Sequence, residues 1–428
     1  MNRGPERAYL VAVEATKTDT VWSVEDSLNE LEALARTAGA EVVGTMRQRL
    51  SHPDPATYLG KGRVQELSDA EMQLNCDLII FDDELSPTQQ HNLEKLLNAR
   101  VVDRTALILD IFAQHARTRE GILQVELAQL EYRLPRLSGQ DLAFTRQAGG
   151  SRGATGGVGG AIGVRGPGET KLEIDRRRIR SRISELKENI EDVRKQRAIY
   201  RRQRSEQAIP VVAVVGYTNA GKSTLFNTLT EAGVLVENKL FATLDPVTRH
   251  IVLPNHQEIL MTDTVGFIQK LPTKLIAAFR ATLEEVVEAD MLLEVVDVNH
   301  ENAIEQSETV NEILEDLDAL AKPRVTALNK MDLVDDPEDI DTSLYPNAVP
   351  VSALQNRGLD RLLHKVADVL ADTMERVDVI IPYRKGDLVE LFHRRGQIVH
   401  EEHQVDGVHI VGRLPHSLRG YYLSYAES

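Results

Sequence analysis

The sequence VVAVVGYTNAGKS, residues 211–223, joins a run of five apolar residues to a glycine-rich segment. The pattern G-x-x-x-x-G-K-[ST] runs from Gly216 to Ser223, and a helical pattern follows from Thr224 to Leu229. A buried strand, a glycine-rich turn and a helix in this order predict a phosphate-binding loop in an α/β domain. Backbone N–H groups of the loop and the positive end of the helix would surround the phosphates.

Three further segments follow in the order that such a loop requires. Asp263, in the segment Thr262-Asp263-Thr264-Val265-Gly266, would hold Mg²⁺ through water, and the N–H of Gly266 would meet a γ-phosphate. Asp332, in Asn329-Lys330-Met331-Asp332, would accept two hydrogen bonds that guanine offers and adenine does not. An unpaired buried acceptor costs about 1–3 kcal/mol, so we expect GTP to be preferred. Ser352-Ala353 would complete the base pocket through backbone N–H groups.

The segment Phe241-Ala242-Thr243-Leu244-Asp245-Pro246 lies where a mobile switch is expected. Thr243 is the best candidate to bind Mg²⁺ through its hydroxyl and to position the attacking water; the alternative is a loop threonine without a ligand. We expect Lys222, Thr243 and Gly266 to be catalytic, and Ser223, Thr243 and Asp263 to hold the metal. The predicted nucleotide-binding residues are Gly216, Tyr217, Thr218, Asn219, Ala220, Gly221, Lys222, Ser223, Thr224, Phe241, Ala242, Thr243, Asp263, Thr264, Val265, Gly266, Asn329, Lys330, Met331, Asp332, Ser352 and Ala353.

These motifs, with others outside the nucleotide site, resemble the HflX family of ribosome-associated GTPases. The resemblance covers most of residues 8 to 372, and the C-terminal tail matches least. The segments that carry it outside the nucleotide site are Tyr58-Leu59-Gly60-Lys61-Gly62, Asp103-Arg104-Thr105, Leu109-Asp110-Ile111-Phe112-Ala113 and Gly166-Pro167-Gly168-Glu169-Thr170. The resemblance implies a GTPase that binds the large ribosomal subunit, splits or rescues stalled ribosomes, and hydrolyses GTP faster when bound there.

Two alternatives remain open. The chain could be an RNA-binding ribosome-assembly scaffold whose GTPase module is regulatory or vestigial. The family is also suspected of using ATP, but in residues 8 to 105 only Gly60-Lys61-Gly62 hints at a phosphate site, and a tight turn before a helix explains it better.

The position after Gly266, where many GTPases carry a water-orienting glutamine, holds Phe267. A phenyl ring cannot orient water by hydrogen bonding, so we expect slow intrinsic hydrolysis. The ribosome, or a water held by Thr243 and backbone groups, would complete the site.

The chain divides into four predicted regions, and the predicted fold class is α/β. Strand and helix signals alternate over residues 8–105, which predicts a small parallel sheet. Leucines from Leu123 to Leu137 and apolar residues from Ile179 to Val193 recur at steps of three and four, which predicts an antiparallel helical hairpin over 106–206. Two helices packed on another core are the alternative. A P-loop GTPase domain (209–372) and a small α+β domain (377–428) follow.

Glycine makes up 10 of the 20 residues from 149 to 168, between the two helices. Either this is a plain linker or a loop that orders on nucleic acid; the resemblance implies that it reaches rRNA near the peptidyl-transferase centre. From Lys171 to Glu206 there are 13 basic and 7 acidic residues, which is typical either of an RNA-binding face or of a solvated helix with internal ion pairs. The candidate RNA-binding residues are Arg146, Arg152, Arg165, Arg176, Arg177 and Arg178, with Arg180 and Arg182 beside them.

The whole chain of 428 residues has a net charge of −16, which argues against a protein coated in basic charge for duplex DNA. No apolar run is long enough to span a membrane, and no secretory signal is visible. The single cysteine, Cys76, cannot form an internal disulfide and is expected to be buried. We therefore expect a cytoplasmic monomer that could associate with a membrane surface, with Mg²⁺ as cofactor, GTP and GDP as ligands, and the large ribosomal subunit and its rRNA as partner.

Overall fold

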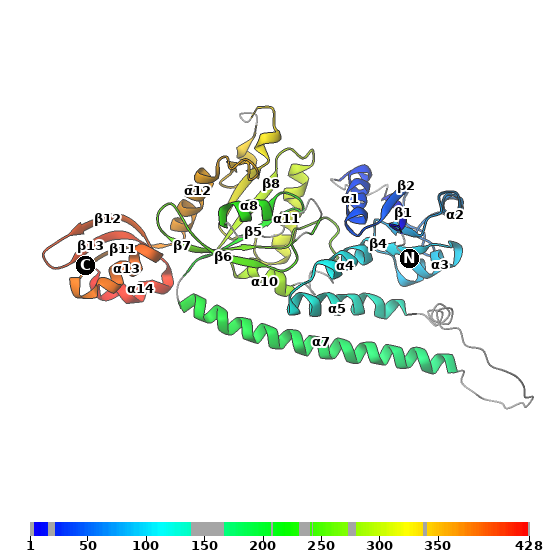
Figure 1. Cartoon of the computed structure of the whole chain (residues 1–428), viewed down its shortest axis with the longest axis horizontal. Helices are drawn as coiled ribbons and strands as arrows, with labels where there is room; N and C mark the ends of the chain where they lie inside the picture. Colours follow the sequence, from blue (N-terminus) through cyan, green and yellow to red (C-terminus); the bar gives the residue numbers. More distant parts are fainter. Residues whose placement is uncertain are drawn as a thin grey trace, which may run out of the picture. The chain divides into compact units, whose positions relative to one another are not determined.

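The structure is a computed structural model of the whole chain, and it describes residues 4–15, 22–137, 167–206, 209–230, 240–241, 243–272, 280–336 and 340–426. The chain forms two compact units, Met1–Ala113 with Ile122–Val193, and Gln114–Gly121 with Arg194–Ser428. Figure 1 shows the α/β character of both units, which confirms the predicted fold class.

The first unit contains a four-stranded parallel sheet of order β2-β1-β3-β4. Each strand alternates with a helix, so the chain crosses over between parallel neighbours as the sequence predicts. The strands are β1 (Arg7–Ala15), β2 (Glu41–Leu50), β3 (Leu78–Phe81) and β4 (Arg100–Asp103). The helices are α1 (Val24–Thr37), α2 (Lys61–Leu74), α3 (Pro87–Leu96) and α4 (Arg104–His115), which continues into the second unit.

Local chemistry explains where these elements begin. Ser86 and Gln89 form a capping box at the start of α3, with Pro87 in its first turn. Gly60 is the N-cap of α2, and its N–H donates to the Gln48 side chain at 3.1 Å. Gly60 therefore belongs to a tight turn before a helix, the reading that the sequence favours over a phosphate site. Cys76 is buried, as expected.

The helical hairpin consists of α5 (Arg119–Arg133) and α7 (Pro167–Glu206). Arg182 pairs with Glu126 at 2.8 Å, and Arg176 donates to the Leu137 carbonyl at 2.9 Å, so the two helices run in opposite directions. This confirms the antiparallel hairpin. The apolar side chains packed between the helices are those of Leu123, Leu127, Leu130, Ile183, Leu186 and Ile190.

Two boundaries of the hairpin are set by proline. Pro135 ends α5, because a 3₁₀ turn replaces the α-helix over Leu134–Arg136. Pro167 is the first residue of α7, a position that suits its fixed φ angle and missing N–H. Pro167 and Gly168 are therefore helical, although the glycine-rich loop was expected to reach residue 168. The rest of that loop lies outside the described residues.

The second unit contains a six-stranded sheet of order β10-β9-β8-β5-β7-β6, in which only β6 is antiparallel to its neighbour. The strands are β5 (Val211–Gly216), β6 (Val247–Val252), β7 (Glu258–Asp263), β8 (Met291–Asp297), β9 (Arg324–Asn329) and β10 (Val349–Pro350). The helices are α8 (Lys222–Thr230), α10 (Arg280–Glu288), α11 (Ala303–Asp316) and α12 (Leu359–Asp372).

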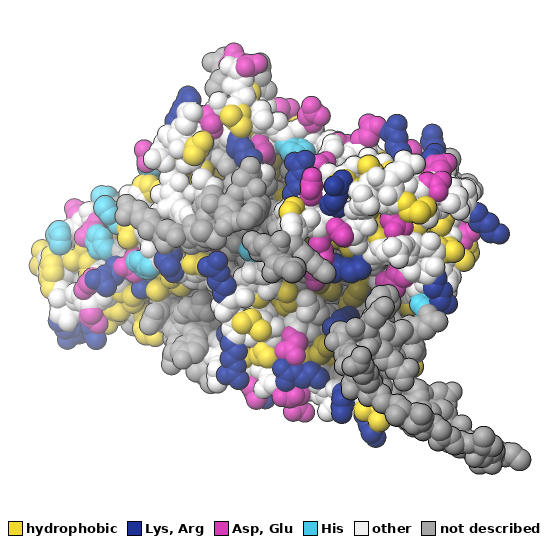
Figure 2. Space-filling view, turned by 45° about the vertical axis from the view of Figure 1, so that its right-hand side comes forward, with side chains coloured by type: hydrophobic (Ala, Val, Ile, Leu, Met, Phe, Trp, Pro, Cys, Tyr) yellow, Lys and Arg dark blue, Asp and Glu magenta, His cyan; other side chains and the backbone are white. Residues whose placement is uncertain are grey.

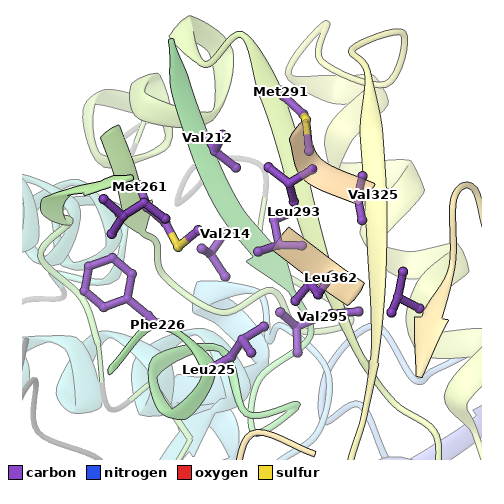
Figure 3. Close-up of a cluster of buried hydrophobic side chains, with 14 of the residues drawn as sticks. Val212, Val214, Leu225, Phe226, Met261, Met291, Leu293, Val295, Val325 and Leu362 are labelled. Carbon is purple, nitrogen blue, oxygen red and sulfur yellow. The ribbon is translucent and has the colours of Figure 1, made fainter. Parts of the chain in front are cut away.

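Every residue of β8 is buried, so both faces of the central sheet are covered. On one face, side chains of α8 and α12 pack against alternate residues of β5 and β8. Figure 3 shows this cluster, in which Phe226 and Leu362 lie with Val214 and Leu293. The core fixes the carboxyl ends of the parallel strands, the edge where ligands bind in open α/β sheets.

The C-terminal region forms an antiparallel sheet of order β11-β13-β12 with two helices. Its elements are β11 (Glu375–Ile381), α13 (Gly386–Arg395), β12 (Gln397–His403), β13 (Val408–Leu414) and α14 (His416–Tyr422). Alternate residues of β13 are buried, and the core includes Phe392 and Tyr422, whose rings meet edge to face at 5.5 Å. A small α+β fold is therefore present, as predicted.

Candidate nucleotide site

The phosphate-binding loop connects the end of β5 to the first residue of α8. Gly216 and Gly221 have φ angles of +140° and +97°, values that favour glycine. A Cβ at Gly216 would also collide with the Val295 carbonyl, and one at Gly221 with the Asn329 amide. The loop can therefore be built only with glycine at both ends, which explains the spacing of the motif.

Lys222 lies beneath this loop and is nearly inaccessible to solvent. Its Nζ donates to the Tyr217 carbonyl at 2.6 Å, and burial lowers the pKa of its ammonium group to about 8. The Nζ would lie 2.9 Å from a Cβ placed on Gly266, so the lysine and this glycine are close neighbours. The sequence predicts that both meet the outer phosphates, and the structure brings them together.

Three oxygen-bearing side chains converge beside the loop. The Ser223 hydroxyl donates to Asp263 Oδ2 at 2.8 Å and lies 2.8 Å from Thr243 Oγ1. Asp263 is fully buried, and its Oδ1 has no hydrogen-bond partner among the residues that the structure describes. Burial raises the pKa of this carboxyl group. These are the three predicted metal ligands, and they come from α8, β7 and the segment before β6.

The segment that the sequence predicts to read guanine, residues 329–332, is joined to the phosphate-binding loop by Asn329. Its Nδ2 donates to the Ala220 carbonyl at 2.9 Å, and its Oδ1 accepts from the Ala353 N–H at 3.0 Å. One buried side chain therefore connects three motifs that are far apart in the sequence. Asp332 lies in a 3₁₀ turn, Met331–Leu333, which follows Lys330 in the left-handed conformation.

These segments surround a cavity of about 360 Å³, a size typical of small-molecule sites. Leu333 and Leu354 also line it, and both are well exposed. They were missed because an exposed leucine carries no motif. The predicted residues in the lining are Thr218, Asn219, Gly221, Lys222, Ser223, Thr224, Phe241, Thr243, Thr264, Gly266, Asn329, Lys330, Asp332 and Ala353.

The remaining predicted residues lie next to the lining. Tyr217, Ala220 and Ser352 are buried and position the loops through backbone contacts. Gly216, Asp263, Val265 and Met331 stand at the ends of strands or behind lining residues. Ala242 lies outside the described residues. Asp297 was not predicted; its carboxylate pairs with Lys330 at 2.6 Å and holds the reading segment.

Phe267 faces the interior. Its side chain is buried, its carbonyl accepts from the Thr218 N–H at 2.8 Å, and its N–H donates to the Gly216 carbonyl at 3.1 Å. These bonds fix the segment after Gly266 against the start of the phosphate-binding loop. Phe267 is not among the residues that line the cavity.

Replacing Phe267 by glutamine is therefore expected to give no gain in intrinsic GTP hydrolysis. The new amide would be buried without partners, which costs about 1–3 kcal/mol of unfolding free energy. Single-turnover hydrolysis and urea unfolding measure the two effects, with Phe267→Leu as the apolar control. A tenfold faster hydrolysis in Phe267→Gln would show instead that this side chain reaches the water.

The candidate RNA-binding arginines divide into two groups. Arg176 and Arg182 make contacts inside the hairpin, Arg176 with the Leu137 carbonyl and Arg182 with Glu126. Arg177, Arg178 and Arg180 are exposed on α7. Arg146, Arg152 and Arg165 lie outside the described residues.

Three family models match the chain. They are GTP-binding GTPase N-terminal over residues 25–113, GTP-binding GTPase Middle Region over 115–204, and 50S ribosome-binding GTPase over 211–330. Within the described residues, no helix is both long enough and apolar enough to span a membrane.

Curated relatives match over nearly the whole chain. GTPase HflX of Caldanaerobacter subterraneus subsp. tengcongensis is 47% identical, over 95% of this chain and 91% of that protein. GTPase HflX of Escherichia coli K12 is 41% identical, over 96% and 94%. Among solved structures, a GTP-binding protein from Sulfolobus solfataricus in complex with GDP is 25% identical, over 86% of this chain and 99% of that one, with a TM-score of 0.42.

Proposed function

The chain belongs to the HflX family of GTPases, and from this premise we propose that Mg²⁺–GTP in the cavity promotes its binding to the large ribosomal subunit. Hydrolysis of GTP then ends that binding, and the cycle serves to split or rescue stalled ribosomes. The proposal that the cavity binds Mg²⁺–GTP rests on one observation: Ser223, Thr243 and Asp263 converge beside a phosphate-binding loop.

The residues fit a magnesium ion. P-loop GTPases generally use Mg²⁺, which prefers oxygen ligands and keeps several waters. Ser223 and Thr243 offer hydroxyl oxygens, and Asp263 offers a buried carboxylate oxygen that lacks a partner among the described residues. Bound there, the ion would supply positive charge that stabilises the negative charge developing on the phosphates during transfer.

Lys222 and Gly266 serve the γ-phosphate in this proposal. When GTP binds, the Lys222 ammonium group exchanges the Tyr217 carbonyl for phosphate oxygens. Charged phosphate oxygens are stronger acceptors for a buried cation than a neutral carbonyl oxygen. Gly266 brings its backbone N–H to the same place, where a side chain would meet Lys222 Nζ and Thr218. Thr243 positions the water through its carbonyl, because Phe267 is held away from the cavity.

The base is read by Asp332. Its carboxylate accepts from N1–H and the 2-amino group of guanine, while Asn329 holds the surrounding loops in register. Lys330 is kept beside the base by Asp297. The exposed Leu333 and Leu354 cover the faces of the ring.

The ribosome part of the proposal rests on the 50S ribosome-binding GTPase match over residues 211–330 and on α7. On the face shown in Figure 2, Lys and Arg side chains are interspersed with Asp and Glu side chains, and the whole chain carries a net charge of −16. A focused contact by exposed arginines on α7 suits such a surface better than general attraction to RNA.

We expect that replacing Arg177, Arg178 and Arg180 together by glutamine weakens binding to purified large subunits by about 10- to 100-fold at physiological salt. Each lost phosphate contact also lowers the slope of log K against log salt by about 0.7–0.9. Affinity for GTP should not change, because these side chains are exposed on a helix outside the nucleotide site. Filter binding over a salt series measures both quantities.

The control removes the same charge elsewhere. A triple glutamine variant at exposed arginines of the N-terminal α/β region should bind subunits as the unmodified chain does; its positions are Arg36, Arg47 and Arg63. Equal weakening in both triple variants would show that net charge matters and α7 does not.

Co-sedimentation with large subunits tests the function as a whole. We expect more protein in the pellet with a non-hydrolysable GTP analogue than with GDP, and light scattering should show dissociation of 70S ribosomes with GTP. Binding that is equal with both nucleotides, without dissociation, would favour the assembly scaffold.

A further inference from the structure

The residues just before α5 belong to the same compact unit as the nucleotide site. Thr118 is the residue that precedes α5, and its Oγ1 accepts from the Gly121 N–H at 3.0 Å. This is the hydrogen bond of a helix N-cap, which satisfies one of the free N–H groups at the helix end. Arg117 and Thr118 still carry backbone N–H groups of their own that need acceptors.

Asp245 supplies those acceptors. Its Oδ2 accepts from the N–H groups of Arg117 and Thr118, both at 2.8 Å, and its Oδ1 accepts from the Thr118 hydroxyl. One carboxylate therefore takes three hydrogen bonds at the positive end of a helix, where negative charge is favoured. Thr118 and Asp245 are 127 positions apart in the sequence.

The sequence of α5 is adapted to this carboxylate. Gly121 lies in the first turn of the helix, where alanine would favour helix formation. A Cβ at this position would overlap Asp245 Oδ1, and it would approach Asp245 Cγ to 3.4 Å. Gly121 leaves space for the carboxylate of Asp245. This space explains why glycine stands here although its helix propensity is low.

Asp245 is also tied to the metal ligands. Only Leu244, which is buried, separates it from Thr243, and Thr243 Oγ1 lies 2.8 Å from Ser223 Oγ. Two residues span at most about 7 Å, so Thr243 and Asp245 cannot move independently over larger distances. The short segment is fixed at one end beside Ser223 and at the other on α5.

A second contact ties the same turn of α5 to α10 through α7. Arg197 of α7 contacts Glu120 at 2.8 Å and Glu285 of α10 at 3.6 Å. The first turn of α5 is therefore connected both to the segment that carries Thr243 and to α10.

We propose that Asp245 is a positioning residue that couples the metal site at Thr243 to the first turn of α5. When Thr243 binds Mg²⁺, the carboxylate of Asp245 is held on the N-terminus of α5; when Thr243 leaves the site, that N-terminus loses its acceptor. In return, α5 holds Thr243 in place for hydrolysis. This inference rests on the proposed role of Thr243.

The test compares the full-length chain with Asp245→Ala and Asp245→Asn. Asp245→Ala should lower kcat for GTP by on the order of 10- to 100-fold and raise the Mg²⁺ concentration needed for half-maximal turnover. Affinity for GDP should stay within twofold. Asparagine keeps an oxygen acceptor for the two N–H groups, so Asp245→Asn should restore most of the turnover.

Amide hydrogen exchange distinguishes coupling from a purely structural role of Asp245, because only coupling makes the exchange rate near α5 depend on the bound nucleotide. In the unmodified chain, amides of residues 114–121 should exchange more slowly with a GTP analogue and Mg²⁺ than with GDP. Asp245→Ala should abolish this difference. Gly121→Ala should do the same by displacing the carboxylate, and it should have no further effect when Asp245 is already alanine.

The outcomes separate two failures. If the unmodified chain hydrolyses GTP but Asp245→Ala keeps its turnover, magnesium dependence and exchange difference, the coupling is wrong. If Thr243→Ala also keeps them, the assigned role of Thr243 is wrong, and the coupling fails with it. Thermal unfolding of each variant shows that a lost signal comes from a folded protein.

Discussion

Replacing Lys222 by alanine is expected to lower kcat/KM for GTP by about 10²–10³-fold, a loss typical for one electrostatic contact in a buried site. The ammonium group is nearly inaccessible to solvent, and the carbonyl of Tyr217 is its present acceptor. With GTP bound, the same cation would meet phosphate oxygens, whose charge it stabilises as the bond breaks. Phosphate release under steady-state conditions measures the effect.

Lys222→Arg is the matched control for charge. The guanidinium group is larger and planar, and it does not place a compact charge where the ammonium group of Lys222 lies. Arginine should therefore fail to restore activity even though the positive charge remains. Hydrolysis within threefold of the unmodified rate in Lys222→Ala would contradict the role assigned to this residue.

Replacing Asp332 by asparagine is expected to weaken GTP binding by about 10- to 100-fold. The side-chain NH₂ of asparagine is a donor, and it would face the 2-amino group of guanine, which is also a donor. Xanthine carries an oxygen in place of the 2-amino group and matches the asparagine amide. Xanthosine triphosphate should therefore bind the variant more tightly than GTP does. Competition against a fluorescent nucleotide measures both affinities.

Asp335→Asn makes the same charge change at an exposed position three residues away. It should leave both affinities as they are, since Asp335 does not line the cavity. An unchanged preference for GTP in Asp332→Asn would mean that another group reads the base.

Much of the fold could be predicted because its signals are local. The buried runs, the glycines at both ends of the phosphate-binding loop and the seams of the hairpin all act within a few residues of one another. Pro135 is an example, since the fixed φ angle and missing N–H of proline end α5 wherever the rest of the chain lies.

The contacts that connect the motifs could not be predicted. Asn329 joins Ala220 to Ala353, and Asp245 joins the segment of Thr243 to the start of α5, yet each pairing depends on how the sheet is assembled. The arginines of α7 show the same limit. Arg182 faces Glu126 and Arg178 faces solvent, but a sequence without its partner helix presents both as equal basic residues.

Calorimetric titration of the purified full-length chain with GTP in Mg²⁺ buffer measures whether the cavity binds this nucleotide. We expect saturable binding of one GTP per chain, weakened when EDTA removes the metal and not reproduced by ATP at this site. Absence of binding heat at several temperatures, with GTP and Mg²⁺ both present and the chain folded, would contradict it.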